Sequence, residues 1–313
     1  MTMVQQAPSG GVPRGPGPGA APGAAPRPVN TQRATRWVWA LLGAIVAGAA
    51  AAGLARSFVQ TTTGLWVDEI AFTGSERGRD QLEPVSHLVL SVVGVPFLVG
   101  AMVVAVAVSL LRRQWGDAAR AVLIVVGANL TTQVLKELID RPDVDGMASL
   151  ANSLPSGHTT VAASVAAVAL LVAPRPARPL VAILGATYTA ATAVATMSLG
   201  WHRPSDVIAA IAVVTAWTLL LMVPGSGRAA DGFPGTSGRV VASLLLGLVA
   251  VVGIGVGVVA LVATLGSAGL AADAASVVDG VPGSALTFAY VGSAVAVVGC
   301  AAASSWAQLL ARR

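Results

Sequence analysis

The only lysine of the sequence and two of its three histidines fall in three short polar segments. The segments are residues 136–142 (KELIDRP), 155–158 (PSGH) and 202–206 (HRPSD), and each lies at the end of a long apolar run. A lysine ammonium binds anions as a point charge, and an imidazole can transfer a proton or attack an electrophile near neutral pH. Together these are the groups needed to hold a phosphate and to attack it.

The first segment contains two cations, Lys136 and Arg141. Lys136 supplies a compact charge, and Arg141 supplies a planar fork that can bind two phosphate oxygens at once. Considered singly, both cations could instead lie at a membrane surface and contact lipid headgroups. Glu137 and Asp140 also offer them local ion-pair partners.

The second segment predicts a helix start that favours anions. Ser156 is suited to the N-cap, and the small Gly157 lets backbone N–H groups approach an anion closely. His158 would stand beside an anion bound there and could exchange a proton with it. The alternative is an ordinary capped helix with a histidine at the surface.

The third segment contains a histidine and a carboxylate four residues apart, His202 and Asp206, with Pro204 suited to the first helical turn. At this spacing Asp206 can reach one imidazole nitrogen, fix the tautomer and leave the other nitrogen free to attack. The alternative is a helix cap beside an interfacial histidine.

The elements that position these segments are predicted to be membrane-spanning helices. The sequence is 55% hydrophobic and 11% charged, with a mean hydropathy of +0.77, whereas soluble domains carry about 25% charged residues. Several apolar runs exceed the roughly 18 residues that span a bilayer as a helix. They are too continuously apolar for barrel strands, so the fold class is an all-α, polytopic membrane protein.

Eight membrane helices are expected, and the fourth of these helices is short for a membrane span. Residues 1–33, which precede them, are rich in Pro, Gly and Ala and contain no acidic residue, so they are expected to be disordered. The expected helices cover residues 36–58, 85–111, 117–135, 158–173, 179–199, 204–223, 240–265 and 285–303.

Arginine distribution predicts the orientation, because cytoplasmic loops are enriched in basic residues. With eight crossings, both termini and the arginine-rich loops fall on one side, which is then cytoplasmic. All three polar segments fall on the opposite, extracytoplasmic side, in what is expected to be the plasma membrane. The arginines used are Arg14, Arg27, Arg33, Arg36, Arg112, Arg113, Arg175, Arg178, Arg228, Arg239, Arg312 and Arg313.

Three other features have structural interpretations. Residues 59–84 are expected to form the first outer loop, which could be an amphipathic lid over the site, contact a lipid headgroup, or be an ordinary solvated loop. Small residues at 253–257 predict close helix packing, within the chain or in a homodimer through the seventh helix. Cys300 is interpreted as a packing residue and His87 as an interfacial one; no basic patch interleaved with aromatic residues suggests nucleic-acid binding.

Taken together, in this order and on one membrane face, the three motifs resemble those of the type 2 phosphatidic acid phosphatase (PAP2) family of lipid phosphatases. The resemblance covers a six-helix core, residues 34–223, and residues 224–313 would add two further transmembrane helices with a short cytoplasmic end. It implies that His202 is the nucleophile, that Asp206 orients it and that His158 protonates the leaving group. Lys136, Arg141, Ser156 and Gly157 would bind the phosphoryl oxygens, and neither a metal nor another cofactor is implied.

Two departures from the family pattern concern arginines. The first motif usually has Arg-Pro after six intervening residues, a position held here by Asp143-Val144, whereas Arg141-Pro142 follows after four. The third motif usually opens with Ser-Arg, and here Ala195 and Thr196 stand there. Arg203, Arg77 or Arg79 could supply the missing charge.

The resemblance predicts hydrolysis of a lipid phosphate or diphosphate at the outer leaflet through a phosphohistidine. The substrate could be an isoprenoid diphosphate, phosphatidate, phosphatidylglycerol phosphate or a polyprenyl-linked sugar phosphate. The missing arginines leave an alternative open, a non-hydrolytic protein that binds or transports lipid phosphates. An ordinary transporter is disfavoured, because no ionisable residue marks a path through the membrane apart from Asp117 and Asp206 near helix ends.

Overall fold

The computed structural model describes residues 31–142, 152–222, 236–271 and 280–312, and every regular element within these ranges is helical. The expected tail lies outside the described residues except for its last three, which already belong to the first helix. The α-helices are α1 (Thr31–Leu54), α2 (Thr62–Gly74), α3 (Arg79–Ser91), α4 (Val95–Leu111), α5 (Trp115–Leu138), α6 (Gly157–Val172), α7 (Arg178–Ser198), α8 (Pro204–Leu221), α9 (Thr236–Ala271) and α11 (Gly283–Ala311). Short helical turns are η1 (Ala55–Val59), η2 (Ser75–Gly78) and η3 (Arg175–Ala177).

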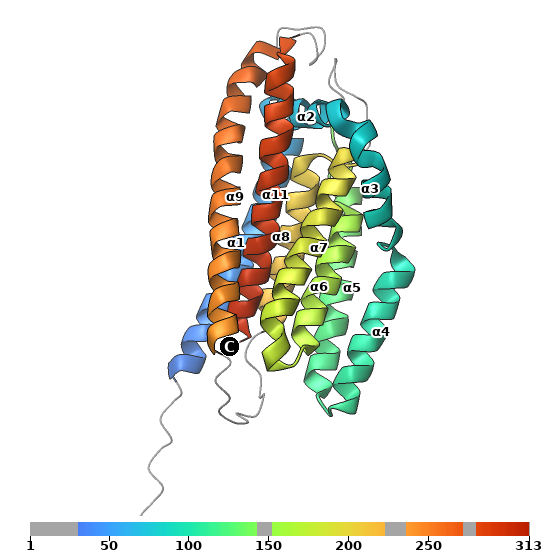
Figure 1. Ribbon diagram of the computed structural model, residues 1–313, viewed down its shortest axis with the longest axis vertical. Coiled ribbons are helices and arrows are strands. Elements are labelled where there is room, and N and C mark those ends of the chain that lie inside the picture. Colours follow the sequence, from blue (N-terminus) through green and yellow to red (C-terminus); the bar gives the residue numbers. More distant parts are fainter. Residues whose placement is uncertain (1–30, 143–151, 223–235, 272–279, 313) are drawn as a thin grey trace, which may run out of the picture.

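The long helices run side by side as a bundle, with α2 lying across one end (Figure 1). Within the described ranges, six helices are long and apolar enough to cross a membrane, and the bent pair formed by Thr62–Ser91 and Val95–Leu111 brings the number to as many as seven. The remaining predicted span, α6, has 16 residues, or about 24 Å at 1.5 Å per residue. That is shorter than the roughly 30 Å hydrocarbon layer. The all-helical, multi-pass membrane fold is thus confirmed.

Two expectations about residues 59–111 were wrong. The expected outer loop, residues 59–84, is instead helical and forms η1, α2, η2 and the start of α3. The expected single helix over residues 85–111 is broken between α3 and α4, with a bend of 43°. The break has a local cause: Gly94 has an extended backbone, and Pro96 follows in the first turn of α4.

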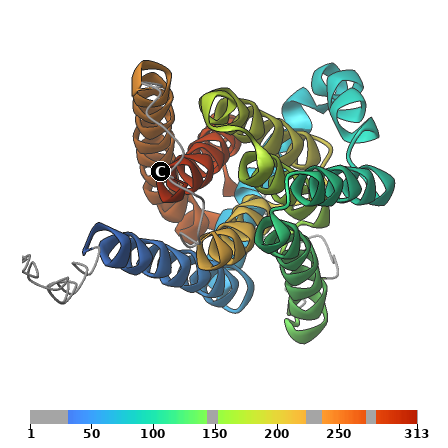
Figure 2. The ribbon, with the colours of Figure 1, turned by 90° about the horizontal axis from the view of Figure 1, so that it is seen from below.

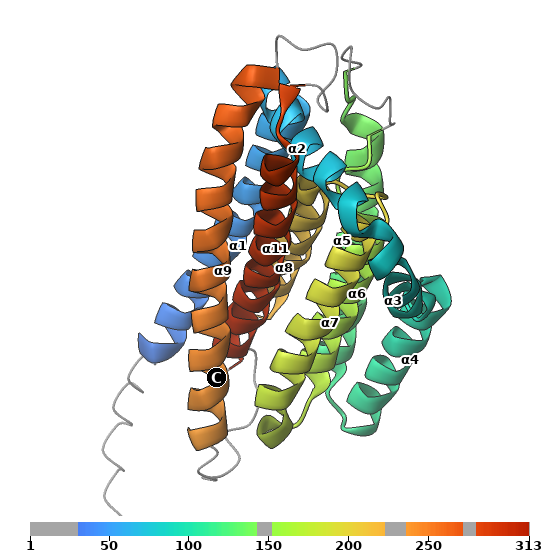
Figure 3. The same cartoon turned by 45° about the horizontal axis from the view of Figure 1, so that its top comes forward.

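The three polar segments meet at the end of the bundle where α2 lies (Figure 3). There α5 ends, and α6 and α8 begin; the backbone N–H of Ser156 donates to the carbonyl of Asp206 at 2.9 Å and joins the two helix starts. Arginines gather at the opposite end, where Arg178 donates to the Arg312 carbonyl and Arg239 to the Leu309 carbonyl. Arg14, Arg27, Arg228 and Arg313 lie outside the described residues.

The two C-terminal helices, α9 and α11, pack closely along their length, and α11 also contacts α2, α7 and α8 (Figure 2). Small residues permit the close approach: a Cβ on Gly253 would lie 2.7 Å from the Gly299 Cα. Gly257 likewise faces Ala296. These two glycines of α9 are therefore used within the chain, so they no longer argue for a homodimer through this helix.

Candidate active site

The imidazole of His202 and the carboxylate of Asp206 lie together at the start of α8. The Nδ1 of His202 is 3.4 Å from Oδ2 of Asp206, and the Asp206 side chain is fully buried. The pair is close because His202 precedes the helix and Asp206 occupies its first turn, with Pro204 at the first helical position. No group in the described part of the chain bonds to Nε2 of His202, so this nitrogen remains available for chemistry.

The Asp206 carboxylate is held by three further donors. Ser153 donates its hydroxyl at 2.5 Å and the backbone N–H of Arg203 donates at 2.9 Å, both to Oδ2. Arg141 reaches Oδ1 with Nη2 at 3.4 Å. These contacts come from both sides of the loop between α5 and α6 and from α8 itself. They fix the carboxylate that orients the His202 ring.

Lys136, at the last turn of α5, points to the first residue of α6. A Cβ on Gly157 would lie 3.8 Å from the Lys136 Nζ, and no described carboxylate pairs with this ammonium. Ser156 caps α6 by accepting from the Thr159 N–H at 3.4 Å, while the first amides of the helix, those of Gly157 and His158, have no acceptor within it. The ammonium and the helix N-terminus together form a site suited to an anion.

His158 occupies the second position of α6, directly after Gly157. It packs against Trp201, with the ring centroids 5.5 Å apart. The His87 ring centroid lies 6.1 Å from that of the same tryptophan. The two histidines of the motifs and the lysine therefore share one site, and Trp201 orients the His158 ring at its edge.

Arg141 brings an unusual surplus of donors to this site. Its side chain is 5% exposed, yet Nε and Nη1 have no hydrogen-bond partner among the described residues. Buried donors are nearly always paired. The two free donors of Arg141 indicate that an anion or an ordered water accepts hydrogen bonds from them.

Of the three arginines proposed to replace the missing charge, Arg79 lies against the turn that precedes His202. Its guanidinium packs directly on Gly200, whose positive φ of 68° and lack of a Cβ make room for it. Arg77 instead packs on Gly283 at the start of α11. Thr196, at the motif position of an arginine, is buried and donates its hydroxyl to the Ala193 carbonyl; Asp143 and Val144 lie outside the described residues.

Arg203 points away from the histidines, toward α2. Its Nε and Nη2 donate to Oε2 of Glu69 at 3.0 and 2.6 Å, and its guanidinium lies 5.0 Å from the Phe72 ring centroid. Asp68, the preceding residue of α2, accepts from the backbone N–H of Ser205 at 3.1 Å and from its hydroxyl at 2.5 Å. Both carboxylates of α2 are buried. They hold the first turn of α8 and hence the position of His202.

Sequence reasoning missed this role of α2, and it also missed Ser153 and Trp201. It placed Asp68 and Glu69 in an outer loop, and the solvated-loop alternative was wrong, because these residues belong to a helix that is buried over Gly64–Ala71. A signal existed: the two carboxylates stand inside the apolar run Leu65–Ala71, where a solvated loop would have few apolar residues. Nothing local indicated that their partners lie about 130 positions away.

The described residues contain no group of three or more His, Cys, Asp or Glu side chains that could hold a metal ion. Their arrangement offers a nucleophilic nitrogen oriented by a carboxylate, a second imidazole and a pocket of cations and helix amides. These are the elements of acid–base and nucleophilic chemistry on an anion. The fold and the site together define a multi-pass helical membrane protein with a polar reaction centre at one end of its bundle.

Comparison with known proteins finds a family model that matches part of the chain. Residues 117–229 match the model of the PAP2 superfamily, in agreement with the resemblance that the motifs indicate. A crystal structure of a transmembrane PAP2 type phosphatidylglycerolphosphate phosphatase from Bacillus subtilis is 24% identical, covers 63% of this chain and 98% of its own, and gives a TM-score of 0.45. No curated protein matches the chain.

Proposed function

We propose that the protein hydrolyses a phosphomonoester or diphosphate on a membrane lipid, with His202 as nucleophile. The Nε2 of His202 attacks phosphorus, the bond from phosphorus to the lipid oxygen breaks, and the leaving oxygen takes a proton from His158. A phosphohistidine results. Water then attacks the phosphorus, His158 accepts its proton, and inorganic phosphate leaves as the His202 nitrogen is regenerated.

The observation that carries this proposal is the convergence of three helix ends on one point. Lys136 reaches Gly157, His158 is the next residue, and the Ser156 N–H bond to the Asp206 carbonyl joins this helix start to the one where Nδ1 of His202 meets Asp206. Cations and helix amides stabilise the charge that accumulates on phosphoryl oxygens during transfer. The residues that match the PAP2 superfamily model include all of these.

Each remaining residue has a role in the proposal. Arg141, with two unpaired donors, binds a phosphoryl oxygen in addition to Asp206. The Ser156 hydroxyl accepts the cap bond and keeps its own proton for the substrate. Arg203, turned onto Glu69, acts on the substrate only indirectly. No metal enters the reaction.

The site is proposed to face the outside of the plasma membrane, with both chain termini in the cytoplasm. The arginines at the other end of the bundle support this orientation, because basic residues favour the cytoplasmic side. A lipid substrate fits a site at the end of a bundle, since its headgroup can reach the polar residues while its chains stay in the bilayer.

The test is phosphate release by the purified protein from a short-chain phosphatidate in detergent, with a chelator present. Wild type should release phosphate, and His202→Asn should release none above background. Asp80→Asn, an exposed residue of α3, is the matched control and should retain wild-type activity. Quenching in alkaline detergent during turnover should trap a base-stable, acid-labile phosphate on the wild-type chain, and equal release by His202→Asn would rule out this mechanism.

A second candidate is a lipid-phosphate binding or transport protein without hydrolysis. It is favoured by Thr196, which replaces an expected arginine with a buried hydroxyl. Under this alternative, wild type releases no phosphate but still binds phosphatidate in vesicles, and Lys136→Ala weakens that binding.

A further inference from the structure

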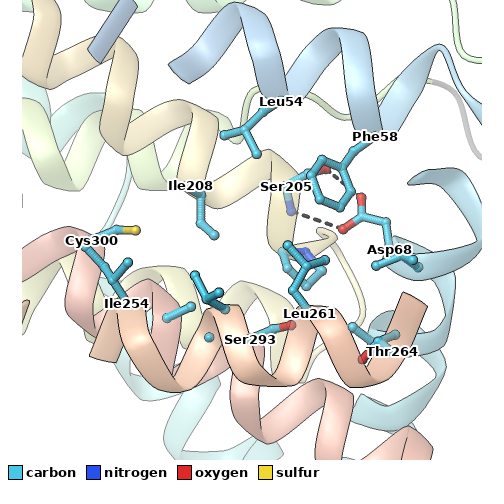
Figure 4. Close-up of a pocket in the computed structure, with 16 residues that line it drawn as sticks. Leu54, Phe58, Asp68, Ser205, Ile208, Ile254, Leu261, Thr264, Ser293 and Cys300 are labelled. Carbon is cyan, nitrogen blue, oxygen red and sulfur yellow. Dashed lines mark hydrogen bonds between the residues drawn. The ribbon is translucent and has the colours of Figure 1, made fainter. Parts of the chain in front are cut away.

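A cavity of about 190 Å³ adjoins the start of α8. Its walls come from α1, η1, α2, α8, α9 and α11, and neither motif histidine, nor Lys136, nor Arg141 lines it. The two C-terminal helices form a large part of it. Figure 4 shows the cavity between the helix that carries Leu54 and the helix that carries Ile254 and Leu261.

The lining of the cavity is mostly apolar, and its polar side chains are Asp68, Ser205, Thr264 and Ser293. Ile208, Ile254, Leu261 and Phe58 contribute hydrocarbon surface. The carboxyl group in the lining is that of Asp68, which is already bonded to Ser205 (Figure 4). An apolar cavity of about 150 Å³ in a protein stays dry and binds hydrocarbons. This cavity is larger, and its lining offers an incoming anion no cation.

The cavity is continuous with the surface that faces the hydrocarbon layer. Val258 of α9 lines it and is 53% exposed, and Ile254, one turn earlier, is 39% exposed. Leu41, Ile45 and Val46 of α1 are also exposed on the bundle surface. α1 and α9 are not packed closely against each other, so a chain in the bilayer can enter between them.

We propose that this cavity binds one hydrocarbon chain of a bulk bilayer lipid, at a site separate from the reaction centre. A lipid chain is the occupant that the exposed apolar helices bring into contact with the cavity. Asp68 disfavours a phosphate there, which separates this site from the one built around Lys136. Because the cavity wall includes Pro204 and Ser205, an occupied site supports the turn that carries His202.

The test uses the full-length protein in vesicles of phosphatidylcholine and phosphatidylglycerol that contain a phosphatidylcholine with a diazirine on its acyl chain. After irradiation, mass spectrometry should find the label on residues 254–264 and 293–300. Two variants fill the cavity, Ser293→Leu inside it and Val258→Trp at its edge, and each should lower this label at least about fivefold, since a filled cavity has no room for a chain. Val251→Trp, exposed on α9 outside the cavity, is the matched control and should keep the label.

Two outcomes would overturn the proposal. One is a label spread evenly along the exposed face of α9 and unchanged in both filled variants. The other is a label that excess phosphatidate abolishes and that Lys136→Ala removes, which would assign the cavity to the substrate. Because the probe lipid has no phosphomonoester, the result does not depend on whether the protein hydrolyses one.

An independent measurement uses Cys300, the only thiol of the sequence, which lines the cavity. A dodecyl methanethiosulfonate should form a disulfide with it and release methanesulfinate, and Ser293→Leu should slow that reaction. A charged, water-soluble thiosulfonate should react far more slowly. Equal rates for the two reagents would contradict entry from the bilayer.

Discussion

The Asp206 carboxylate is the residue on which the geometry of the site depends most. Replacing it by Asn keeps the size of the side chain but removes the charge that faces His202 and Arg141. We expect phosphate release by Asp206→Asn to fall by about 10²–10⁴-fold, the range in which positioned acid–base groups contribute. The measurement is kcat for phosphatidate hydrolysis. Retention of more than a tenth of the wild-type kcat would contradict an orienting role.

We expect Lys136 to contribute more to anion binding in this site than a lysine would in a site that contained additional arginines. No described carboxylate neutralises it, and it points to the amides at Gly157. A hydrogen bond to a charged group contributes about 1.5–3 kcal/mol, so Lys136→Ala should lower kcat/KM about 10- to 150-fold. Lys136→Arg should recover part of the loss. The exposed Glu137→Gln, its neighbour, is the control and should leave kcat/KM near wild type.

At the scale of elements, α2 is the support of the nucleophile loop. Glu69→Gln leaves the buried Arg203 guanidinium without its carboxylate, and breaking a buried ion pair costs about 3–5 kcal/mol. We expect this variant to lower the Tm in detergent and to lose activity. The double variant Glu69→Leu with Arg203→Leu should recover much of the Tm, because two apolar side chains leave no buried charge.

The same double variant separates two roles of Arg203. If its guanidinium only supports the loop, activity should return together with the Tm. A stable but inactive double variant would show instead that Arg203 acts on the substrate. The exposed pair formed by His87 and Glu83 on α3 provides a control, since Glu83→Gln should change the Tm little, as exposed pairs contribute about 0–1 kcal/mol.

The sequence correctly predicted those features of the elements that depend only on neighbouring residues. Long apolar runs are enough to predict the spanning helices, and Ser156 and Pro204 mark the starts of α6 and α8 correctly. The missed features depend on distant partners. Asp68 can be buried in α2 only because Ser205, 137 positions away, supplies two donors. No period or motif in residues 59–84 contains that information.

At the scale of the whole molecule, the two ends of the bundle differ in charge chemistry. One end combines the reaction centre with buried carboxylates, and the other gathers arginines that donate to helix-end carbonyls, such as Arg112 to Val172 and Arg178 to Arg312. Arginines near helix ends are retained on the cytoplasmic side during insertion. The arrangement therefore predicts one orientation in the membrane, with the reaction centre outside.

Single cysteines in a Cys300→Ser background test this orientation. Glu76→Cys is exposed in η2, near the reaction centre, and Gln114→Cys is exposed at the arginine-rich end, before α5. A membrane-impermeant maleimide added to intact cells should label Glu76→Cys, and it should label Gln114→Cys only after permeabilisation. The opposite pattern would place the reaction centre in the cytoplasm. In that case a substrate in the inner leaflet would be required, although the chemistry proposed for His202 would be unaffected.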